Sequence, residues 1–309
     1  MESSLNFFKI ENNFYKNKNI IITGATSPVG ISLVETLFSL GANLLLISHD
    51  ESKLKNTFKH LFSKNSYDND NNEEEEEEEE KQSENKSINS ENKNLIQYEI
   101  INLENPKEIN NKYPLCLKKL KARLDILLIC HRISLNCKIK ECSTENFDKI
   151  MNLNVRSIFH ILSISVPFLK LTKGNCVILS SMDSFIPKNK NFLNTTAKAM
   201  INSLVQNSAL ELSSFGIRIN AVAPTKIKNE EKNDINNFNY NFGMGFGNSQ
   251  DDNDINMYPL GKKFVEKNNV ADTILFLASD EASFITGEII QNDNGYSINH
   301  GMSYTKDNL

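Results

Sequence analysis

The chain has 309 residues, of which 39% are hydrophobic and 24% are charged, and its formal net charge is -5 at pH 7. This length and composition fit one large α/β domain or two small ones. The sequence offers no basic patch for nucleic acid, and no apolar stretch reaches the roughly 20 residues of a membrane span.

The first elements predicted are a strand at 19–22, a glycine-bearing turn at 23–30, a helix that ends near Gly41 and a strand at 44–47. Three consecutive isoleucines make the first strand a short apolar run, which is typical of a buried strand. Two parallel strands joined by a helix predict an α/β fold with a doubly wound parallel sheet.

The same alternation continues to the end of the chain. Apolar runs predict strands at 95–103, 124–129, 176–179, 217–222 and near 287–290, and helices at 144–166, 195–215 and 270–278. Helix 144–166 is apolar nearly all round, which indicates burial on more than one side. The pattern predicts a three-layer α/β fold in which helices cover both faces of the parallel sheet.

Two low-complexity stretches interrupt the pattern. Residues 64–94 contain a glutamate run at 73–80 and are predicted to be a disordered acidic surface insertion, with a regulatory role as the alternative. Residues 226–256 are rich in Asn and Asp. Because roughly 250 residues remain without these stretches, we expect a single domain over residues 1–309 with its core at about 17–302.

The five cysteines are odd in number, and no signal peptide is recognisable before them. We therefore expect reduced thiols in a cytoplasmic protein. Cys137 and Cys142 are close in sequence, but no second pair accompanies them, so no metal site is expected.

Several segments, in chain order, resemble landmarks of one family. They are the turn at 23–30 and the segments 124–127, 152–155, 180–182, 216–224 and 279–287. With these landmarks the chain resembles the short-chain dehydrogenase/reductase family over about residues 17–302. The resemblance implies a Rossmann-type fold that binds NAD(P)(H). The nearest likeness is to classical members that reduce ketones or 3-oxoacyl thioesters, and residues 226–256 stand where these members have a substrate lid.

The resemblance assigns the four catalytic positions of the family to Asn154, Ser181, Asn194 and Lys198. Asn154 would hold a water in a proton relay, and Ser181 would position the substrate carbonyl. Lys198 would bind the nicotinamide ribose and lower the pKa of a tyrosine phenol. In this chain the position of that tyrosine is occupied by Asn194. Because positions i and i+4 share a helix face, Asn194 is expected beside Lys198, but an amide cannot supply the proton.

The resemblance also implies a set of cofactor-binding residues. They are Thr23, Gly24, Ser27, Val29, Gly30, His49, Asn102 and Lys198. Pro28 replaces the middle glycine of the family's dinucleotide turn. We expect Ser27 to cap the helix and Pro28 to be its first residue, with the helix N-terminus facing a pyrophosphate. A plain strand-to-helix turn is the alternative.

The residues after the second strand favour NADP(H) over NAD(H). Ser48 replaces the acid that binds the ribose diol in NAD-preferring members, and His49 lies where NADP-preferring members often have arginine. A solvated loop histidine is the alternative reading of His49. Asn102 replaces the aspartate that contacts adenine in the family.

The family's Asn-Asn-Ala-Gly motif after the fourth strand reads Ile129-Cys130-His131-Arg132 here. Side chains of this size crowd the cofactor cleft unless the loop turns them away. The ordinary pKa of histidine is near neutrality, so His131 is a candidate substitute proton donor, with a packing or surface role as the alternative.

Two functional hypotheses remain. In the first, the chain is a catalytically impaired member that acts as a cofactor-binding or assembly subunit. It forms homo- or hetero-oligomers through helices 144–166 and 195–215, the usual dimer interface of the family. In the second, it is an active NADP(H)-dependent carbonyl or 3-oxoacyl-thioester reductase. That enzyme would act on a small carbonyl substrate and use His131 or water as the acid. A structural role without nucleotide is a third alternative.

Overall fold

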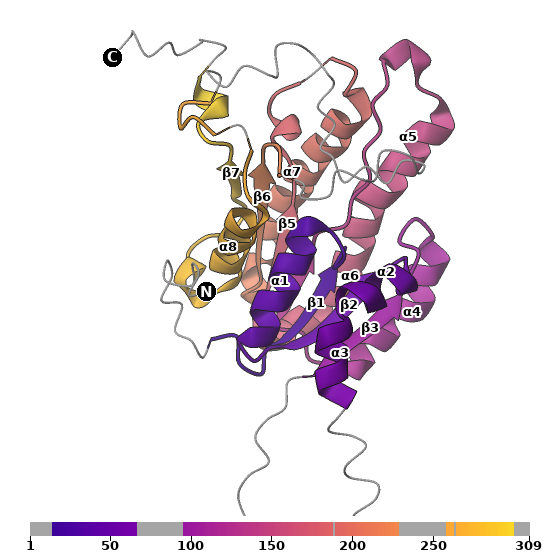
Figure 1. Ribbon diagram of the computed structural model, residues 1–309, viewed down its shortest axis with the longest axis vertical. Coiled ribbons are helices and arrows are strands. Elements are labelled where there is room, and N and C mark those ends of the chain that lie inside the picture. The colour runs from indigo at the N-terminus through magenta and orange to yellow at the C-terminus, as the bar shows by residue number, and fades with distance from the viewer. Residues whose placement is uncertain (1–13, 67–94, 188, 229–257, 263, 300–309) are drawn as a thin grey trace, which may run out of the picture.

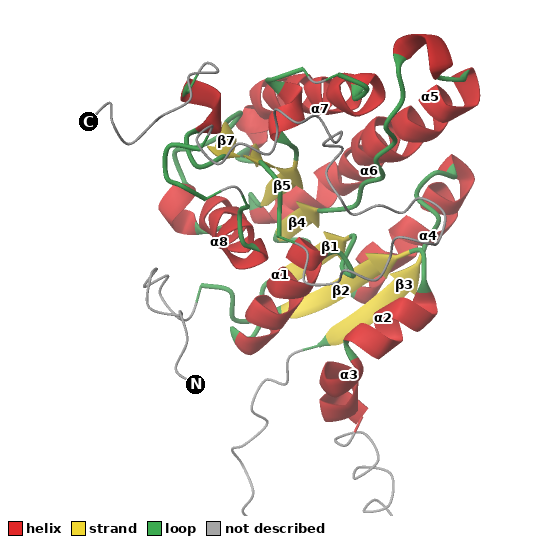
Figure 2. Cartoon of the chain, turned by 45° about the horizontal axis from the view of Figure 1, so that its top comes forward, coloured by secondary structure: helices red, strands yellow, loops and turns green. Residues whose placement is uncertain are grey.

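The computed structural model describes residues 14–66, 95–187, 189–228, 258–262 and 264–299. In these residues a seven-stranded parallel sheet lies between two layers of helices, as Figures 1 and 2 show. The predicted three-layer, doubly wound fold of Rossmann type is confirmed, and it forms a single domain.

The strands in chain order are β1 (Asn19–Thr23), β2 (Asn43–Ser48), β3 (Ile96–Ile100), β4 (Ile126–Ile129), β5 (Asn175–Leu179), β6 (Arg218–Pro224) and β7 (Ile289–Asn292). Their order in the sheet is β3-β2-β1-β4-β5-β6-β7. The chain direction across the sheet therefore reverses between β1 and β4. In such sheets the crevice outside the carboxyl ends of the strands at this reversal is the usual ligand site.

The helices are α1 (Pro28–Ser39), α2 (Glu51–Thr57), α3 (Lys59–Ser66), α4 (Pro106–Lys119), α5 (Thr144–Met151), α6 (Ser157–Thr172), α7 (Phe192–Leu212) and α8 (Lys267–Ala278). Short helical turns are η1 (Ile139–Glu141), η2 (Asn152–Arg156), η3 (Met182–Ser184), η4 (Ser213–Phe215), η7 (Asp280–Ala282) and η8 (Tyr296–Ile298). Helices α4, α6 and α7 share one core cluster with one face of the sheet, and α1, α2 and α8 share another with the opposite face. Burial on both faces explains why the strands are continuous apolar runs.

The structure corrects several predicted bounds. The helix predicted at 144–166 extends to Thr172 and contains the π-helical turn η2 between α5 and α6. By length and composition the whole segment Thr144–Thr172 would pass as a membrane span, which the sequence did not suggest, but it contributes residues to the core of this fold. The helix predicted at 195–215 begins at Phe192, so Asn194 lies inside α7.

The two predicted insertions fall mainly outside the described residues. The acidic insertion was predicted from residue 64, but residues 64–66 are the end of α3, and 67–94 lie outside the described residues. In the Asn-rich stretch, Ile227 forms a parallel bridge with Val265, while 229–256 lie outside the described residues. The core also begins before residue 17, because Tyr15 is buried and donates a hydrogen bond to Leu275 O.

Candidate cofactor-binding and catalytic site

The turn between β1 and α1 is tightly packed. Gly24 has φ +66°, and a Cβ on it would lie 2.5 Å from His131 N. A Cβ on Gly30 would lie 2.3 Å from Gly24 O. Ser27 caps α1 by accepting a hydrogen bond from Gly30 N at 3.1 Å, and Pro28 is the first helical residue, as predicted. Both glycines are therefore required by close backbone contacts.

The same turn presents unpaired donors. Within the described part of the chain, the backbone N–H groups of Thr26 and Val29 have no hydrogen-bond acceptor. They lie at the N-terminal end of α1, where unpaired N–H groups and the helix dipole favour an anion. Such donors suit an anion such as a phosphate group.

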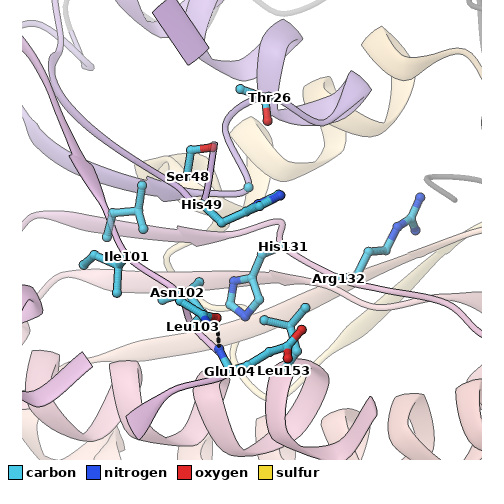
Figure 3. Close-up of a pocket in the computed structure, with 12 residues that line it drawn as sticks. Thr26, Ser48, His49, Ile101, Asn102, Leu103, Glu104, His131, Arg132 and Leu153 are labelled. Atoms are coloured by element: carbon cyan, nitrogen blue, oxygen red, sulfur yellow. Dashed lines mark hydrogen bonds between the residues drawn. The ribbon is translucent and has the colours of Figure 1, made fainter. Parts of the chain in front are cut away.

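A pocket opens at the carboxyl ends of the strands around the β1–β4 reversal (Figure 3). Its void, counted out to the open mouth, is about 530 Å³. It is lined by Gly24, Thr26, Ile47, Ser48, His49, Ile101, Asn102, Leu103, Glu104, His131, Arg132 and Leu153. Of the predicted cofactor residues, Gly24, His49 and Asn102 therefore meet in one pocket, and Thr23, Ser27, Val29 and Gly30 lie in the adjoining strand end and turn.

Some polar groups in and beside this pocket already make hydrogen bonds within the protein. The Ser48 hydroxyl accepts a hydrogen bond from Asp50 N at 3.2 Å, and the Asp50 carboxylate caps α2. Asn102 Oδ1 accepts from Glu104 N at 3.0 Å, the dashed contact of Figure 3. Sequence reasoning missed Glu104, which belongs to no recognisable motif, and Leu153, which lies in the landmark segment 152–155 but was assigned no role.

His131 is a structural bridge. Its Nδ1 is 2.7 Å from Thr23 Oγ1, and its Nε2 is 2.7 Å from Ser157 Oγ. Because the Ser157 hydroxyl donates to Leu153 O, its oxygen accepts from Nε2–H, and Nδ1 is left to accept from Thr23. Burial and the nearby Lys198 ammonium lower the pKa of His131 to about 3. Of the two readings of His131 these contacts support the packing role, because both ring nitrogens are occupied and the imidazole is neutral.

Asn154 and Asn194 hold the segment that follows β4. Asn154 accepts a hydrogen bond from Ile133 N at 2.9 Å and donates to Ile133 O at 2.8 Å. Asn194 accepts from Leu135 N at 3.1 Å and donates to Leu135 O at 3.2 Å. A second Asn194 donor contacts Asn191 Oδ1, and both asparagines are buried. Two amide side chains, on η2 and α7, thus brace the segment 133–135.

The remaining catalytic positions converge at the ends of β4 and β5. Ile129 pairs with Ile178, so residues that follow these two strands face each other across the cleft. Ser181 is buried and accepts a hydrogen bond from Asp183 N at 3.2 Å. Lys198 Nζ donates to Leu179 O at 3.0 Å. Burial and the Arg132 guanidinium lower the pKa of Lys198 to about 7, although Asp183 opposes that change.

Taken together, these residues fit a dinucleotide. The pocket opens beside the turn, the turn offers unpaired N–H donors, and among the described residues the buried Lys198 ammonium has one acceptor for its three donors. Such a cofactor would supply or accept a hydride when bound.

Known proteins resemble this chain along most of its length. A family model described as enoyl-(acyl carrier protein) reductase matches residues 70–297. The chain belongs to the short-chain dehydrogenase/reductase family. The expected family is thereby confirmed, and with it a nicotinamide cofactor is implied.

Individual members of the short-chain dehydrogenase/reductase family match at low identity but high coverage. A tropinone reductase homologue of Arabidopsis thaliana is 26% identical over 295 residues, which span 93% of this chain and 94% of that protein. An NAD-dependent glycerol dehydrogenase of Listeria innocua is 26% identical over 283 residues, spanning 91% and 94%. The structure of a short-chain type dehydrogenase/reductase from Mycobacterium ulcerans superposes with a TM-score of 0.72 at 21% identity, covering 92% of this chain and 90% of that one, and shows the same fold.

Proposed function

We propose that the chain is a short-chain dehydrogenase/reductase that binds a nicotinamide nucleotide but has lost efficient hydride transfer, and that it serves as a cofactor-binding or assembly subunit. The observation that carries this proposal is the pairing of the Asn194 amide with Leu135. The side chain at the proton donor's position makes hydrogen bonds to Leu135 N and O at 3.1 and 3.2 Å. The amide group of Asn194 thus holds the backbone of Leu135 in place.

The loss of the phenol has a calculable consequence. A positioned general acid contributes about 10²–10⁴-fold to the rate of a proton-coupled step. An amide does not ionise near neutral pH, and both N–H donors of Asn194 already have acceptors. His131 does not replace it, because its ring nitrogens bind Thr23 and Ser157. Turnover is therefore expected to be reduced by at least this factor relative to an active member.

For the cofactor we propose NADP(H) over NAD(H). Ser48, a neutral residue, ends β2 in the pocket, and the nearby Asp50 carboxylate is committed to the N-terminus of α2. Ser48 does not repel a ribose 2′-phosphate, the N-terminus of α2 partly offsets the charge of Asp50, and His49 is exposed at the same edge. Titration with both nucleotides tests this choice.

The decisive experiment combines binding and turnover. Nicotinamide fluorescence is followed while NADPH and NADH are added to the full chain, and oxidation of the bound nucleotide is then followed with a diketone or an acetoacetyl thioester. We expect saturable NADPH binding without measurable turnover. Asn194→Tyr should bind NADPH and remain inert, because Cys130, His131 and Arg132 also differ from the family's small residues. Rapid turnover by the unmodified chain would refute the impairment, and absence of saturable binding would refute the cofactor role.

One observation favours a second candidate, a slow NADP(H)-dependent reductase of small carbonyl compounds. Burial and Arg132 bring the pKa of Lys198 to about 7, so a fraction of this ammonium can release a proton near neutral pH. Only the protonated form carries the proton. A slow reduction that uses Lys198 should therefore fall as the pH rises through about 7, whereas a reduction that uses water should lack this step.

The assembly role is supported by an apolar groove on the outer face of α5, α6 and α7. It is lined by Met151, Asn152, Val155, Arg156, Phe159, Met200, Ser203, Leu204 and Asn207. Phe159 is 60% exposed and Met200 46% exposed in the single chain, so the predicted burial on more than one side does not arise within one chain. We propose that a second copy or a related subunit covers this groove. We also propose that the protein is cytoplasmic.

Light scattering after gel filtration tests the assembly. Phe159→Glu places a charge in the groove and should shift the chain from an oligomer to a monomer. Phe284→Glu is the matched control, since Phe284 is fully exposed outside this groove. A monomeric unmodified chain, or equal effects of the two changes, would contradict the proposed interface.

A further inference from the structure

Two of the five thiols lie at the two ends of one short turn. Cys137 and Cys142 flank η1, which is closed by a hydrogen bond from Glu141 N to Lys138 O at 2.9 Å. A fully extended chain would place the Cα atoms of residues 137 and 142 about 17 Å apart, so the turn brings its two ends together.

The two thiols contact each other and are not bonded. Burial and a hydrogen bond with the Cys142 thiol raise the pKa of Cys137 to about 11. Both cysteines are free and half-buried. Packing against the core explains why they are half-buried, since a free cysteine behaves as a small apolar side chain, but packing alone does not require two thiols in contact.

The other three thiols differ from this pair. Cys116, Cys130 and Cys176 are buried, so the fold shields them from a reagent. Cys130 and Cys176 belong to core clusters on opposite faces of the sheet, and a disulfide between them would have to cross it. These thiols therefore serve as internal controls for any reaction at the turn.

The turn is linked to the position of the missing phenol. Cys137 forms a parallel bridge with Asn191, the residue that precedes α7. Asn191 Oδ1 accepts a hydrogen bond from Asn194, and Asn194 also holds Leu135, two residues before Cys137. A covalent bond between Cys137 and Cys142 would therefore fix the loop that leads from Leu135 to α5.

We propose that Cys137 and Cys142 form an intrachain disulfide when a hydroperoxide oxidises the chain, which makes this turn a reversible modification site. The proposal goes beyond the proposed function and does not depend on cofactor binding. It uses two thiols that no step of the reductase chemistry requires.

The reaction has two steps. The Cys142 sulfur attacks hydrogen peroxide, the O–O bond breaks, and the thiol proton leaves in a first water, which converts Cys142 to a sulfenic acid. The Cys137 sulfur then attacks the Cys142 sulfur, the S–O bond breaks, and the hydroxyl group leaves with the Cys137 proton as a second water. The two thiols lose two electrons and two protons, and the peroxide is reduced. Cys142 reacts first because a pKa of about 11 keeps Cys137 protonated near neutral pH.

Peptide mapping of the unmodified full chain tests the proposal. Hydrogen peroxide is added to the folded chain, the remaining thiols are blocked with N-ethylmaleimide in denaturant, and the peptides are analysed by mass spectrometry. We expect a Cys137–Cys142 disulfide, lighter than the dithiol by two hydrogen atoms, that forms at least about tenfold faster than any product of the buried thiols. Dithiothreitol should reverse it.

Two matched variants separate the roles of the two thiols. Cys137→Ser should accumulate a sulfenic acid at Cys142, which dimedone traps. Cys142→Ser should react with peroxide at least about tenfold more slowly, because only the protonated Cys137 remains at the turn. The proposal is overturned if the unmodified chain oxidises Cys137 and Cys142 separately to sulfinic acids, or if either thiol pairs instead with a second chain. The map of the unmodified chain needs no variant and decides the matter by itself.

Discussion

Replacing His131 by glutamine should make the free energy of unfolding depend less on pH below neutrality. The folded chain holds the His131 pKa at about 3, whereas an unfolded histidine has a pKa of about 6.5. Between these values the unfolded chain binds more protons, so the free energy of unfolding rises with pH in this window. The stabilisation is fully present above pH 6.5 and is lost progressively as the pH falls from 6.5 towards 3.

The stability lost at pH 5 depends little on the exact pKa of His131 in the folded chain. With an unfolded pKa of 6.5, lowering the pH from 7.5 to 5.0 costs about 2 kcal/mol for any folded pKa below about 4. Urea unfolding at both pH values measures this loss in the unmodified chain and in His131→Gln. The variant should lose about 2 kcal/mol less, because glutamine does not titrate.

Other groups titrate in the same pH range, so the test compares the stability lost by the variant with that lost by the unmodified chain. His49→Gln removes an exposed histidine from the same pocket and serves as the control. If His131→Gln and the unmodified chain lose the same free energy between the two pH values, the buried neutral histidine and its bridge to Thr23 and Ser157 are refuted.

Two further predictions use contrasts within the chain. Gly24→Ala and Gly261→Ala both place alanine at φ +66°, but a Cβ on Gly24 meets the backbone of His131 at 2.5 Å while one on Gly261 has nothing within 4 Å. Gly261→Ala should cost about 1 kcal/mol from backbone strain alone, and Gly24→Ala should cost several times more and abolish nucleotide binding in a fluorescence titration. Similar unfolding midpoints would contradict the contact. Timed alkylation followed by mass spectrometry should label the half-buried Cys137 and Cys142 first, because burial shields the other thiols from the reagent. The shielded thiols are Cys116, Cys130 and Cys176.

The strands were predictable because helices cover both faces of the sheet, which selects continuous runs such as Ile20 to Ile22. Helix α4 was missed although its buried residues Ile109, Tyr113 and Cys116 recur at helical spacing. Pro114 lies inside this helix and masks the pattern. Short amphipathic helices with polar outer faces give a weaker signal than a buried strand.

The site was only half predictable, for a geometric reason. Residues at the carboxyl ends of strands meet whenever a parallel sheet forms, so Gly24, His49 and Asn102 could be grouped from sequence. The roles of Asn194 and His131 depend on partners distant in sequence. Asn194 binds Leu135 across 59 residues, and His131 binds Thr23 across 108. No local pattern encodes these pairings, which arise only when α7 and the segment after β4 are packed together.

The described chain resumes after the acidic stretch at the end of β2 that lies away from the pocket. Leu95, where the described chain resumes, donates a hydrogen bond to Asn43 at the beginning of β2. Ser48, at the other end of β2, lines the pocket. A strand of this length separates the two points by about 17 Å, roughly two Debye lengths at physiological ionic strength. A charge at Leu95, where the chain rejoins the fold after the glutamate run, would therefore be electrostatically screened from an anionic cofactor in the pocket.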